Sequence, residues 1–245
     1  MHIWIGFDPR ETAAFAVARE SIKRRLTVPV PIDGLVLDVM KARGLYWRPT
    51  EKRLGKMFDV ISQAPMSTEF AISRFLIPHL NNGRGGYELF MDCDMLVRGN
   101  LMRVFDEIRA RKSKGERHAV WCVKHDHQPV NTVKMDGCEQ TTYARKNWSS
   151  FMVFDCDHHG NKRLTLELVN SARGRDLHNF CWLEESEIRE IDPKWNYLVG
   201  HTELPETTDP KVVHYTDGGP WFHGFENVEY ADEWRSELNR WASCR

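Results

Sequence analysis

The sequence has no long apolar run, no closely paired cysteines and no excess of either charge. No stretch approaches the roughly 18 apolar residues that a membrane-spanning helix needs. The apolar start, residues 2–7, meets Asp8 and Pro9 too soon for a signal peptide. We therefore expect a cytoplasmic protein without a transmembrane segment.

The balance of charge excludes one large class of partners. Lys and Arg total 34 against 35 Asp and Glu, a formal net charge of -1, so no global positive field favours nucleic acid. The 6 cysteines form no C-x-x-C pair, and we expect reduced thiols. There is no internal repeat, low-complexity tract or long linker, which favours one domain over residues 1–245.

Short apolar segments alternate with segments of helical spacing, as in an α/β protein. Asp8, Pro9 and Glu11 are typical of a helix start. Residues 41–65 show no clean period, and we expect a mobile loop or irregular insert there. Strands are expected at residues 2–7, 35–38, 87–91, 119–123, 149–154 and 212–215. Helices are expected after residue 8 and at residues 67–80, 101–111, 164–170 and 232–241.

The sharpest local motif is Asp92-Cys93-Asp94 after the apolar strand 87–91. Residues i and i+2 of an extended chain point the same way, so the two carboxylates converge where α/β sheets bind ligands. Such a pair suits a divalent cation that bridges to phosphates. Two solvated acids in a turn are the plain alternative. A D-x-D phosphohydrolase, with Asp92 as nucleophile, is another, although Met95-Leu96 and the distance from the N-terminus disfavour it.

A second motif is the strand end and turn at residues 214–221. His214 is a good ligand for an ion such as Mn²⁺ and would complete the site of the two aspartates, whereas a lone histidine there is more often structural. Gly218 and Gly219 allow the backbone to approach a diphosphate closely.

Several other residues are weaker candidates. Lys124 to His127 follow a strand and are expected near a ligand at the edge of the sheet. Asp176 either contacts a hydroxyl group of a ligand or caps a helix, and Trp195 either stacks on a ligand ring or lies in the core. The basic residues between 109 and 117 form a solvated face or, with a lipid-linked ligand, a peripheral membrane contact.

Taken in order, these segments resemble the family 8-like glycosyltransferases of GT-A fold. The likeness includes Phe7-Asp8, residues 67–75, Asp92-x-Asp94, residues 147–154, residues 195–197 and the turn 214–221. It spans the chain from about residue 3 to residue 221. The resemblance implies a Rossmann-like mixed sheet flanked by helices, and metal-dependent transfer from a nucleotide-sugar, most often a UDP-sugar, with retention of configuration.

The resemblance also implies roles for individual residues. Phe7 and Asp8 would lie near the base, and Arg74 near the donor diphosphate or sugar. Asp92, Asp94 and His214 would bind Mn²⁺ or Mg²⁺. The predicted substrate contacts are Phe7, Asp8, Arg10, Arg74, Lys124, Ser149, Ser150, Asp176, Trp195, Gly218, Gly219 and Trp221, and the predicted catalytic residues are Asp94, Arg74 and Asp176.

The chain departs from the family pattern at two places. The family turn commonly reads H-x-x-G-x-x-K-P-W, whereas here it is one residue shorter and Gly219 precedes Pro220-Trp221. The cation for the leaving diphosphate would then come from Arg10, Arg74 or Lys124. Ser149-Ser150 stand where the family has asparagine before small residues, and Asn147 is displaced by two.

The sequence thus predicts a hexosyltransferase that uses a UDP-sugar and a glycan, glycolipid or other hydroxyl acceptor. Two alternatives stay open. One is the D-x-D phosphohydrolase, and the other is a non-catalytic nucleotide-sugar or glycan-binding domain, suggested by the absent turn lysine.

Overall fold

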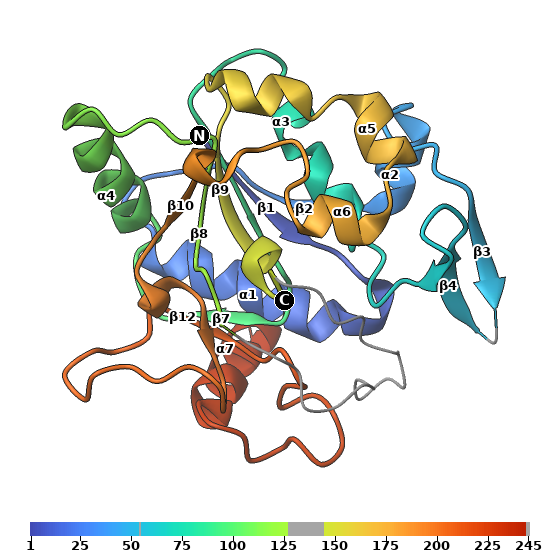
Figure 1. The fold of residues 1–245 in the computed structure, drawn as a ribbon. Helices are drawn as coiled ribbons and strands as arrows, with labels where there is room; N and C mark the ends of the chain where they lie inside the picture. The colour runs from blue at the N-terminus through green and yellow to red at the C-terminus, as the bar shows by residue number, and fades with distance from the viewer. Residues whose placement is uncertain (54, 127–144, 244–245) are drawn as a thin grey trace.

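A central six-stranded sheet organises the protein. The structure is a computed structural model that describes residues 1–53, 55–126 and 145–243 (Figure 1). The sheet has the order β10-β8-β9-β6-β1-β2. Its strands are β1 His2–Gly6, β2 Ile32–Leu35, β6 Tyr87–Met91, β8 Val120–Cys122, β9 Phe151–Asp155 and β10 Ile188–Glu190.

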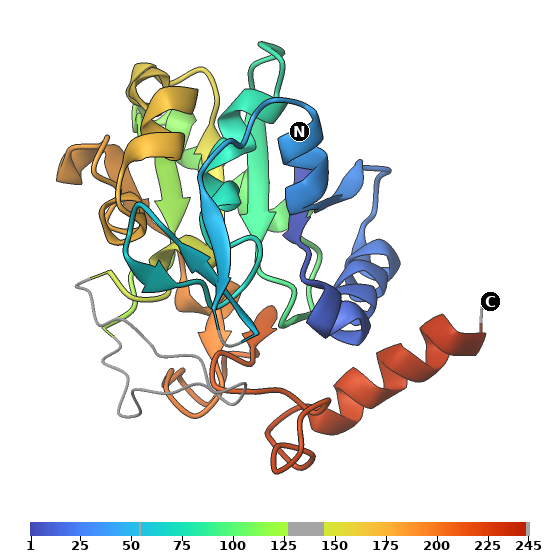
Figure 2. The same ribbon diagram turned by 90° about the vertical axis from the view of Figure 1, so that its right-hand side faces the viewer.

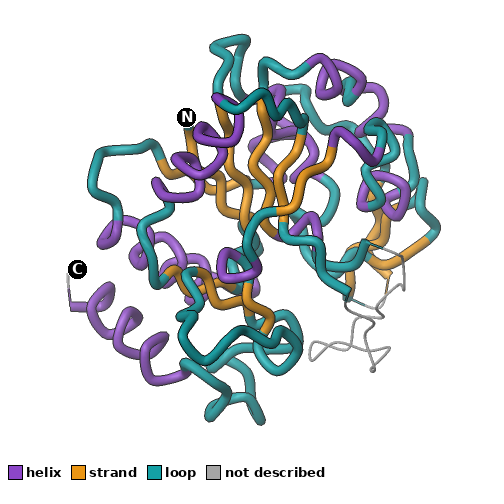
Figure 3. Tube along the Cα trace, turned by 60° about the vertical axis from the view of Figure 1, so that its left-hand side comes forward, coloured by secondary structure: helices purple, strands orange, loops and turns teal. Residues whose placement is uncertain are grey.

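The sheet is mixed, because one of its central strands runs against its neighbours. β1 pairs in parallel with β2 and β6, whereas β9 is antiparallel to both β6 and β8. Every residue of β6 and β9 is buried. Figure 3 shows helices on either side of these strands, which explains why both are apolar except at Glu88 and Asp155 and do not alternate with polar residues.

The helices are mostly short. They are α1 Thr12–Arg25, α2 Leu37–Ala42, α3 Ile77–Leu80, α4 Met102–Ser113, α5 Leu166–Ser171, α6 Gly174–His178 and α7 Ala231–Ser243. Single 3₁₀ turns join several elements: η1 Pro9–Glu11, η2 Ser73–Leu76, η3 Trp148–Ser150, η4 His159–Arg163, η5 Glu185–Glu187 and η6 Pro193–Trp195. Asp8 caps the first of these turns, since its carboxylate accepts a hydrogen bond from the Arg10 backbone N–H at 2.9 Å.

Two small sheets accompany the central one. The first has the order β11-β12-β7, and the second is the antiparallel β3-β4-β5. Their strands are β11 Tyr197–Leu198, β12 Val212–His214, β7 Met95–Val97, β3 Thr50–Arg53, β4 Lys56–Asp59 and β5 Ala64–Pro65. β7 follows Asp94 directly and pairs with β12 so that His214 lies opposite Met95. This register brings the end of β12 to the end of β6.

Three sequence predictions of secondary structure are wrong. The strand expected at 35–38 is β2, which lies three residues earlier, and α2 begins at Leu37. The expected irregular insert contains the small sheet β3-β4-β5. The helix expected at 67–80 is confined to η2 and α3. In each case tertiary packing outweighs a local pattern that is weak over a short segment.

Two further findings concern membrane-spanning helices and cysteines. Among the described residues, no helix has both the length and the apolar character needed to span a membrane. Cys93, Cys122, Cys156 and Cys181 are free thiols, as expected, while Cys138 and Cys244 lie outside the described residues.

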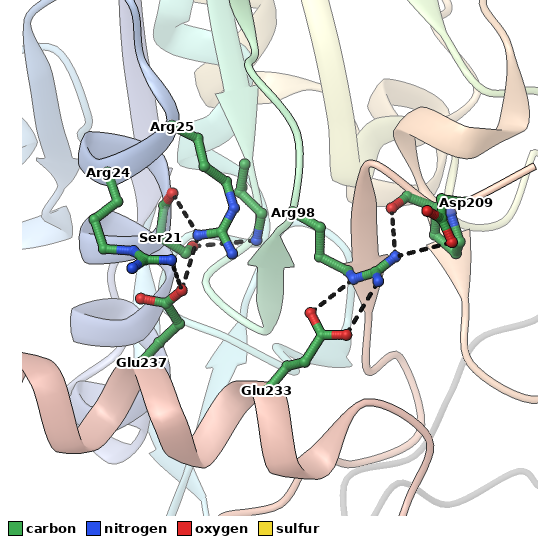
Figure 4. A network of polar contacts seen from close by, with 9 residues as sticks. Ser21, Arg24, Arg25, Arg98, Asp209, Glu233 and Glu237 are labelled. Carbon is green, nitrogen blue, oxygen red and sulfur yellow. Dashed lines mark hydrogen bonds and ion pairs between the residues drawn. The ribbon is translucent and has the colours of Figure 1, made fainter.

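Ion pairs attach the C-terminal helix to the rest of the protein (Figure 4). In Figure 2, α7 lies beneath α1 with the C-terminus at its outer end. The Glu237 carboxylate contacts Arg24 at 3.0 Å and Arg25 at 2.9 Å, both on α1. Glu233 contacts Arg98 at 2.8 Å, at the more exposed end of the network. Glu237 is therefore the buried acceptor that connects the two helices.

Replacing Glu237 by glutamine should lower the free energy of unfolding by about 1 to 2 kcal/mol, because the buried acceptor of Arg24 and Arg25 loses its negative charge. Glu233→Gln is the matched control, and it should cost less than about 1 kcal/mol because its pair is exposed to solvent. Urea unfolding of both variants measures the difference. Equal losses in the free energy of unfolding would show that burial of Glu237 does not strengthen its ion pairs with Arg24 and Arg25.

Candidate functional site

The two aspartates lie at the carboxyl end of β6, where neighbouring segments hold their backbone. The Asp92 N–H donates to the Ser150 carbonyl at 2.9 Å, which ties the motif to η3. The Tyr215 N–H donates to the Asp94 carbonyl at 3.0 Å, which ties it to the end of β12. The motif is therefore fixed from both sides.

Asp92, Asp94 and His214 converge as the sequence predicts. Each offers one ligand atom, and these atoms all lie within 4.8 Å of one another. His214 is buried, and its Nε2 lies 3.4 Å from Asp94 Oδ1. Two carboxylates and one imidazole are a donor set that suits Mn²⁺ or Mg²⁺.

A chain of hydrogen bonds orients the imidazole of His214. Its Nδ1 lies 3.0 Å from the Asn196 side-chain oxygen. The Asn196 amide donates to Ser150 Oγ at 2.9 Å, and that hydroxyl donates to the Asn147 carbonyl at 2.6 Å. Because the Asn196 side-chain oxygen only accepts, Nδ1 donates to it, and Nε2 is the ring nitrogen that faces the aspartates. This is the arrangement expected of a metal-binding histidine.

Another group of ligand-type side chains is His158, His159 and Glu187. There the Glu187 carboxylate already contacts Arg163 and accepts the Glu184 N–H at 2.9 Å. His158 Nδ1 accepts the Gly160 N–H at 3.0 Å. These side chains serve local structure, so the aspartate group is the better metal candidate.

Arg74 connects the metal candidate to η3. Its guanidinium lies 2.8 Å from Asp92 Oδ1 and donates to the Ser149 carbonyl at 2.9 Å. The same group lies over the rings of Phe70 and Phe90, at 5.3 and 5.0 Å from their centroids. Arg74 thus holds a fixed, largely buried positive charge beside Asp92, and its predicted contact with a diphosphate stays a prediction.

Ser149 and His178 form a polar pair beside Arg74. Ser149 Oγ lies 2.7 Å from His178 Nδ1. Burial, followed by the nearby charges of Arg74 and Lys146, lowers the pKa of His178 well below its ordinary 6.5. The imidazole is therefore neutral at pH 7. The sequence pointed to Ser149 but gave no reason to pair it with His178.

A pocket of about 260 Å³ opens beside Asp92 and Arg74. Among the predicted site residues, Arg74, Asp92, Ser149 and Ser150 line it. The other described lining residues are Asp59, Ser62, Ala64, Pro65, Met66, Ser67, Ala71, Ile72, Lys146, Asn147, Arg173, Gly174, Arg175 and His178. Polar groups thus converge on a cavity next to the metal candidate, as expected of a ligand site.

The predicted base-contacting residues are bound to one another. Asp8 is fully buried and accepts hydrogen bonds from the Arg10 guanidinium at 2.9 and 2.8 Å and from the Glu69 N–H at 3.1 Å. Burial raises the pKa of Asp8, but the hydrogen bonds from Arg10 outweigh it and the pKa is lowered overall. Phe7 packs edge-on against Phe15 at 5.2 Å. Contact of these residues with a base stays a prediction.

The turn after His214 is packed more tightly than the sequence suggested. A Cβ added to Gly219 would lie 2.0 Å from the Trp221 ring. Packing of the Trp221 ring against the backbone therefore requires a glycine here, whether or not a ligand also approaches it. Trp221 packs on Tyr215 and Trp234, with ring centroids 5.8 and 5.2 Å away. Together with Gly218, these residues lie outside the described pocket lining.

Four weaker sequence candidates lie elsewhere. Trp195 is buried and donates its indole N–H to Glu107 at 3.0 Å, so the core alternative is correct. Lys124 contacts Glu185 at 2.6 Å. Asp176 lies inside α6 rather than at its cap, 3.5 Å from Arg175. His127 lies outside the described residues.

The basic run that begins on α4 is partly engaged within the chain. Arg111 pairs with Glu116 at 2.9 Å, and Lys112 pairs with Asp155 at 2.6 Å. The run begins on α4 and ends before β8. Arg109 also pairs with Asp106, at 3.5 Å. Three of the five cations of the run are therefore in ion pairs within the chain, so the expected solvated face is partly used for intramolecular contacts.

The chain resembles a curated plant protein along nearly its whole length. It is 42% identical over 242 residues to Protein CDI of Arabidopsis thaliana, an alignment that covers 98% of this chain and 86% of that protein. The chain belongs to the family of Protein CDI. No model of a protein family matches this family member.

Solved glycosyltransferase structures share the fold of this member of the Protein CDI family. The bifunctional glycosyltransferase WbbM has a TM-score of 0.62 at 16% identity and matches 97% of this chain, which spans only 49% of the WbbM chain. The galactosyltransferase LgtC, solved with donor and acceptor sugar analogues, has a TM-score of 0.60 at 14% identity, covering 98% and 96% of the two chains. These similarities confirm the predicted α/β fold of GT-A type, with a mixed sheet flanked by helices.

Proposed function

We propose that the chain is a metal-dependent glycosyltransferase of the family 8-like type, which moves a hexose from a UDP-sugar to a hydroxyl acceptor with retention of configuration. The observation that carries the proposal is the convergence of Asp92, Asp94 and His214 beside a polar pocket. The shared fold of LgtC and WbbM supports it. The acceptor would be a glycan, a glycolipid or another hydroxyl compound.

In this proposal the two aspartates and His214 hold Mn²⁺ or Mg²⁺. When bound, such an ion supplies Lewis-acid stabilisation of the negative charge on the departing diphosphate. Asn196 keeps His214 in the tautomer that can act as a ligand. Arg74 holds Asp92 in place and adds fixed positive charge near the leaving group.

The pocket residues would position the reacting sugar. The Ser149 hydroxyl, hydrogen-bonded to neutral His178, is available to contact a sugar hydroxyl. The acceptor hydroxyl would attack the anomeric carbon as the bond to the diphosphate breaks. Asp176 is absent from the described lining, so the proposal gives it no catalytic role.

Thermal unfolding with nucleotide and metal tests the proposal. UDP at about 100 times its dissociation constant should stabilise the wild type by roughly 2.7 kcal/mol in the presence of Mn²⁺. GDP, CDP and ADP should stabilise it less. Asp92→Ala/Asp94→Ala should show no metal-dependent shift with UDP, because both carboxylate ligands are gone.

Two results would redirect the assignment. If no nucleotide shifts the melting temperature with any metal, and phosphate esters are cleaved through a phosphorylated Asp92, the protein is a phosphohydrolase. If UDP and Mn²⁺ bind but a broad panel of donors and acceptors gives neither transfer nor donor hydrolysis, it is a binding domain.

A further inference from the structure

The pocket beside Asp92 contains more positive than negative side chains among its described lining residues. Its carboxylates are those of Asp59 and Asp92. Its cationic side chains are those of Arg74, Lys146, Arg173 and Arg175. The described lining therefore has an excess of positive charge even before the pairing of these groups is considered.

Both carboxylates of this lining are already held by arginines. Asp59 forms a fully buried ion pair with Arg48, at 2.6 Å between Oδ2 and the guanidinium. Asp92 pairs with Arg74 at 2.8 Å. Neither carboxylate is therefore placed to neutralise Arg173 or Arg175.

The backbone that carries Arg173 and Arg175 is fixed at the wall of the pocket. The Gly174 N–H donates to Ser62 Oγ at 2.7 Å, and a Cβ on Gly174 would lie 3.2 Å from the same oxygen. In Figure 1 this start of α6 lies on the same side of the molecule as the β3–β4 hairpin. Arg173 and Arg175 thus lie on either side of Gly174, which is held close to Ser62 in the wall of the pocket.

The guanidinium groups of these two arginines have little negative charge around them. Arg175 is 3.5 Å from the half-exposed Asp176 carboxylate, which is a weak pair. Arg173 is exposed, and across the described parts of the chain its guanidinium makes no hydrogen bond or ion pair with another residue. A ligand can therefore reach both groups without first breaking a strong pair.

We propose that this pocket binds a sugar that carries an anionic group, a carboxylate or a phosphate, through Arg173 and Arg175. The inference rests on the proposed glycosyl transfer. A guanidinium matches the two oxygens of a carboxylate or phosphate with two parallel hydrogen bonds, whereas a neutral hexose offers hydroxyls alone. The charged sugar belongs either to the donor, as a uronic acid, or to the acceptor, as a sugar acid or sugar phosphate.

Three matched pairs of charged and neutral substrates, one of donors and two of acceptors, distinguish these sources. UDP-glucuronic acid is compared with UDP-glucose as donor, by following UDP release with Mn²⁺. Glucose 6-phosphate and glucuronic acid are compared with glucose as acceptor, using the better donor. The wild type should prefer the charged member of one pair by about 10- to 100-fold in kcat/KM, and Arg173→Ala/Arg175→Ala should lose that preference, because its loss of rate falls mainly on the charged member.

Binding of UDP with Mn²⁺, measured by thermal shift on the same proteins, separates this inference from the proposed function. Equal shifts in the wild type and the double variant, together with the loss of preference, support the inference. A wild type without preference in any of the three pairs overturns it, as does a double variant with weakened UDP binding, because the arginines would then contact the diphosphate. If the wild type does not bind UDP at all, the proposed function fails and this inference with it. Arg109→Ala, an exposed arginine on α4, is the control for loss of charge.

Discussion

Replacing Asp94 by asparagine should lower the rate of sugar transfer by about 100- to 1,000-fold or more, which is the cost of losing one strong electrostatic contribution to a transition state. The substitution keeps the shape of the side chain but removes its charge. Asp94 Oδ1 lies 3.4 Å from His214 Nε2, so the same change also takes an anion away from the imidazole. Added Mn²⁺ should not restore the rate, which is measured as turnover at increasing metal concentration.

Asn196→Ala, in the same site, should have a smaller effect than Asp94→Asn. Asn196 contacts His214 rather than the ion, so its loss should weaken Mn²⁺ binding by about 10- to 100-fold, and saturating metal should recover most of the rate. Asp106→Asn, on the exposed face of α4, is the control for removing an aspartate and should behave as the wild type. Full activity of Asp94→Asn at low Mn²⁺ would contradict the assignment of this ligand.

Replacing Asp59 by alanine should cost the fold about 3 to 5 kcal/mol, because it leaves the guanidinium of Arg48 buried without its counter-ion. The side chains of the pair are 1% and 0% exposed. Arg48 also donates to the carbonyls of Val169 and Ala172, at 2.8 and 2.7 Å, so it joins the β3–β4 hairpin to α5. The melting temperature should fall by about 6 to 20 °C in a chain of this size, as calorimetry would show.

A second ion pair on the same hairpin tests whether burial is the cause of the large loss of stability expected from Asp59→Ala. Glu51 and Arg53 form an ion pair on the same hairpin with both side chains half exposed, and Glu51→Ala should change stability by less than about 0.5 kcal/mol. The double variant Arg48→Met/Asp59→Ala should regain part of the loss, since no charge then stays buried. A loss from Asp59→Ala as small as that from Glu51→Ala would disprove the account.

The sequence predicted the parts of the fold whose signal is local and strong. The strand before Asp92 stood out because β6 is buried on both faces and is therefore apolar at every position except Glu88. The residues Thr50 to Arg53 of β3 gave no such signal, because three of the four are exposed and charged. That hairpin is stabilised by Arg48 and Asp59, a contact that no period in the sequence reveals.

The same distinction applies to the candidate site. Asp92, Asp94 and His214 are recognisable by residue type and by their position at strand ends, and the structure brings them together. Asn196 was visible only as part of a family-like segment, and its hydrogen bond to His214 depends on tertiary packing. Arg173 and Arg175 reach the pocket because Gly174 contacts Ser62, a pairing that sequence spacing does not suggest.

The antiparallel pairing of β7 with β12 also determines when the site can exist during synthesis. β1, β2 and β6 are made early, so the ribosome releases the two aspartates long before His214. Because pairing between distant segments waits for the later one, a growing chain that ends before residue 212 has an incomplete ligand set at the edge of its sheet. In the proposed site, metal binding would therefore report the arrival and docking of β12, close to the end of the polypeptide.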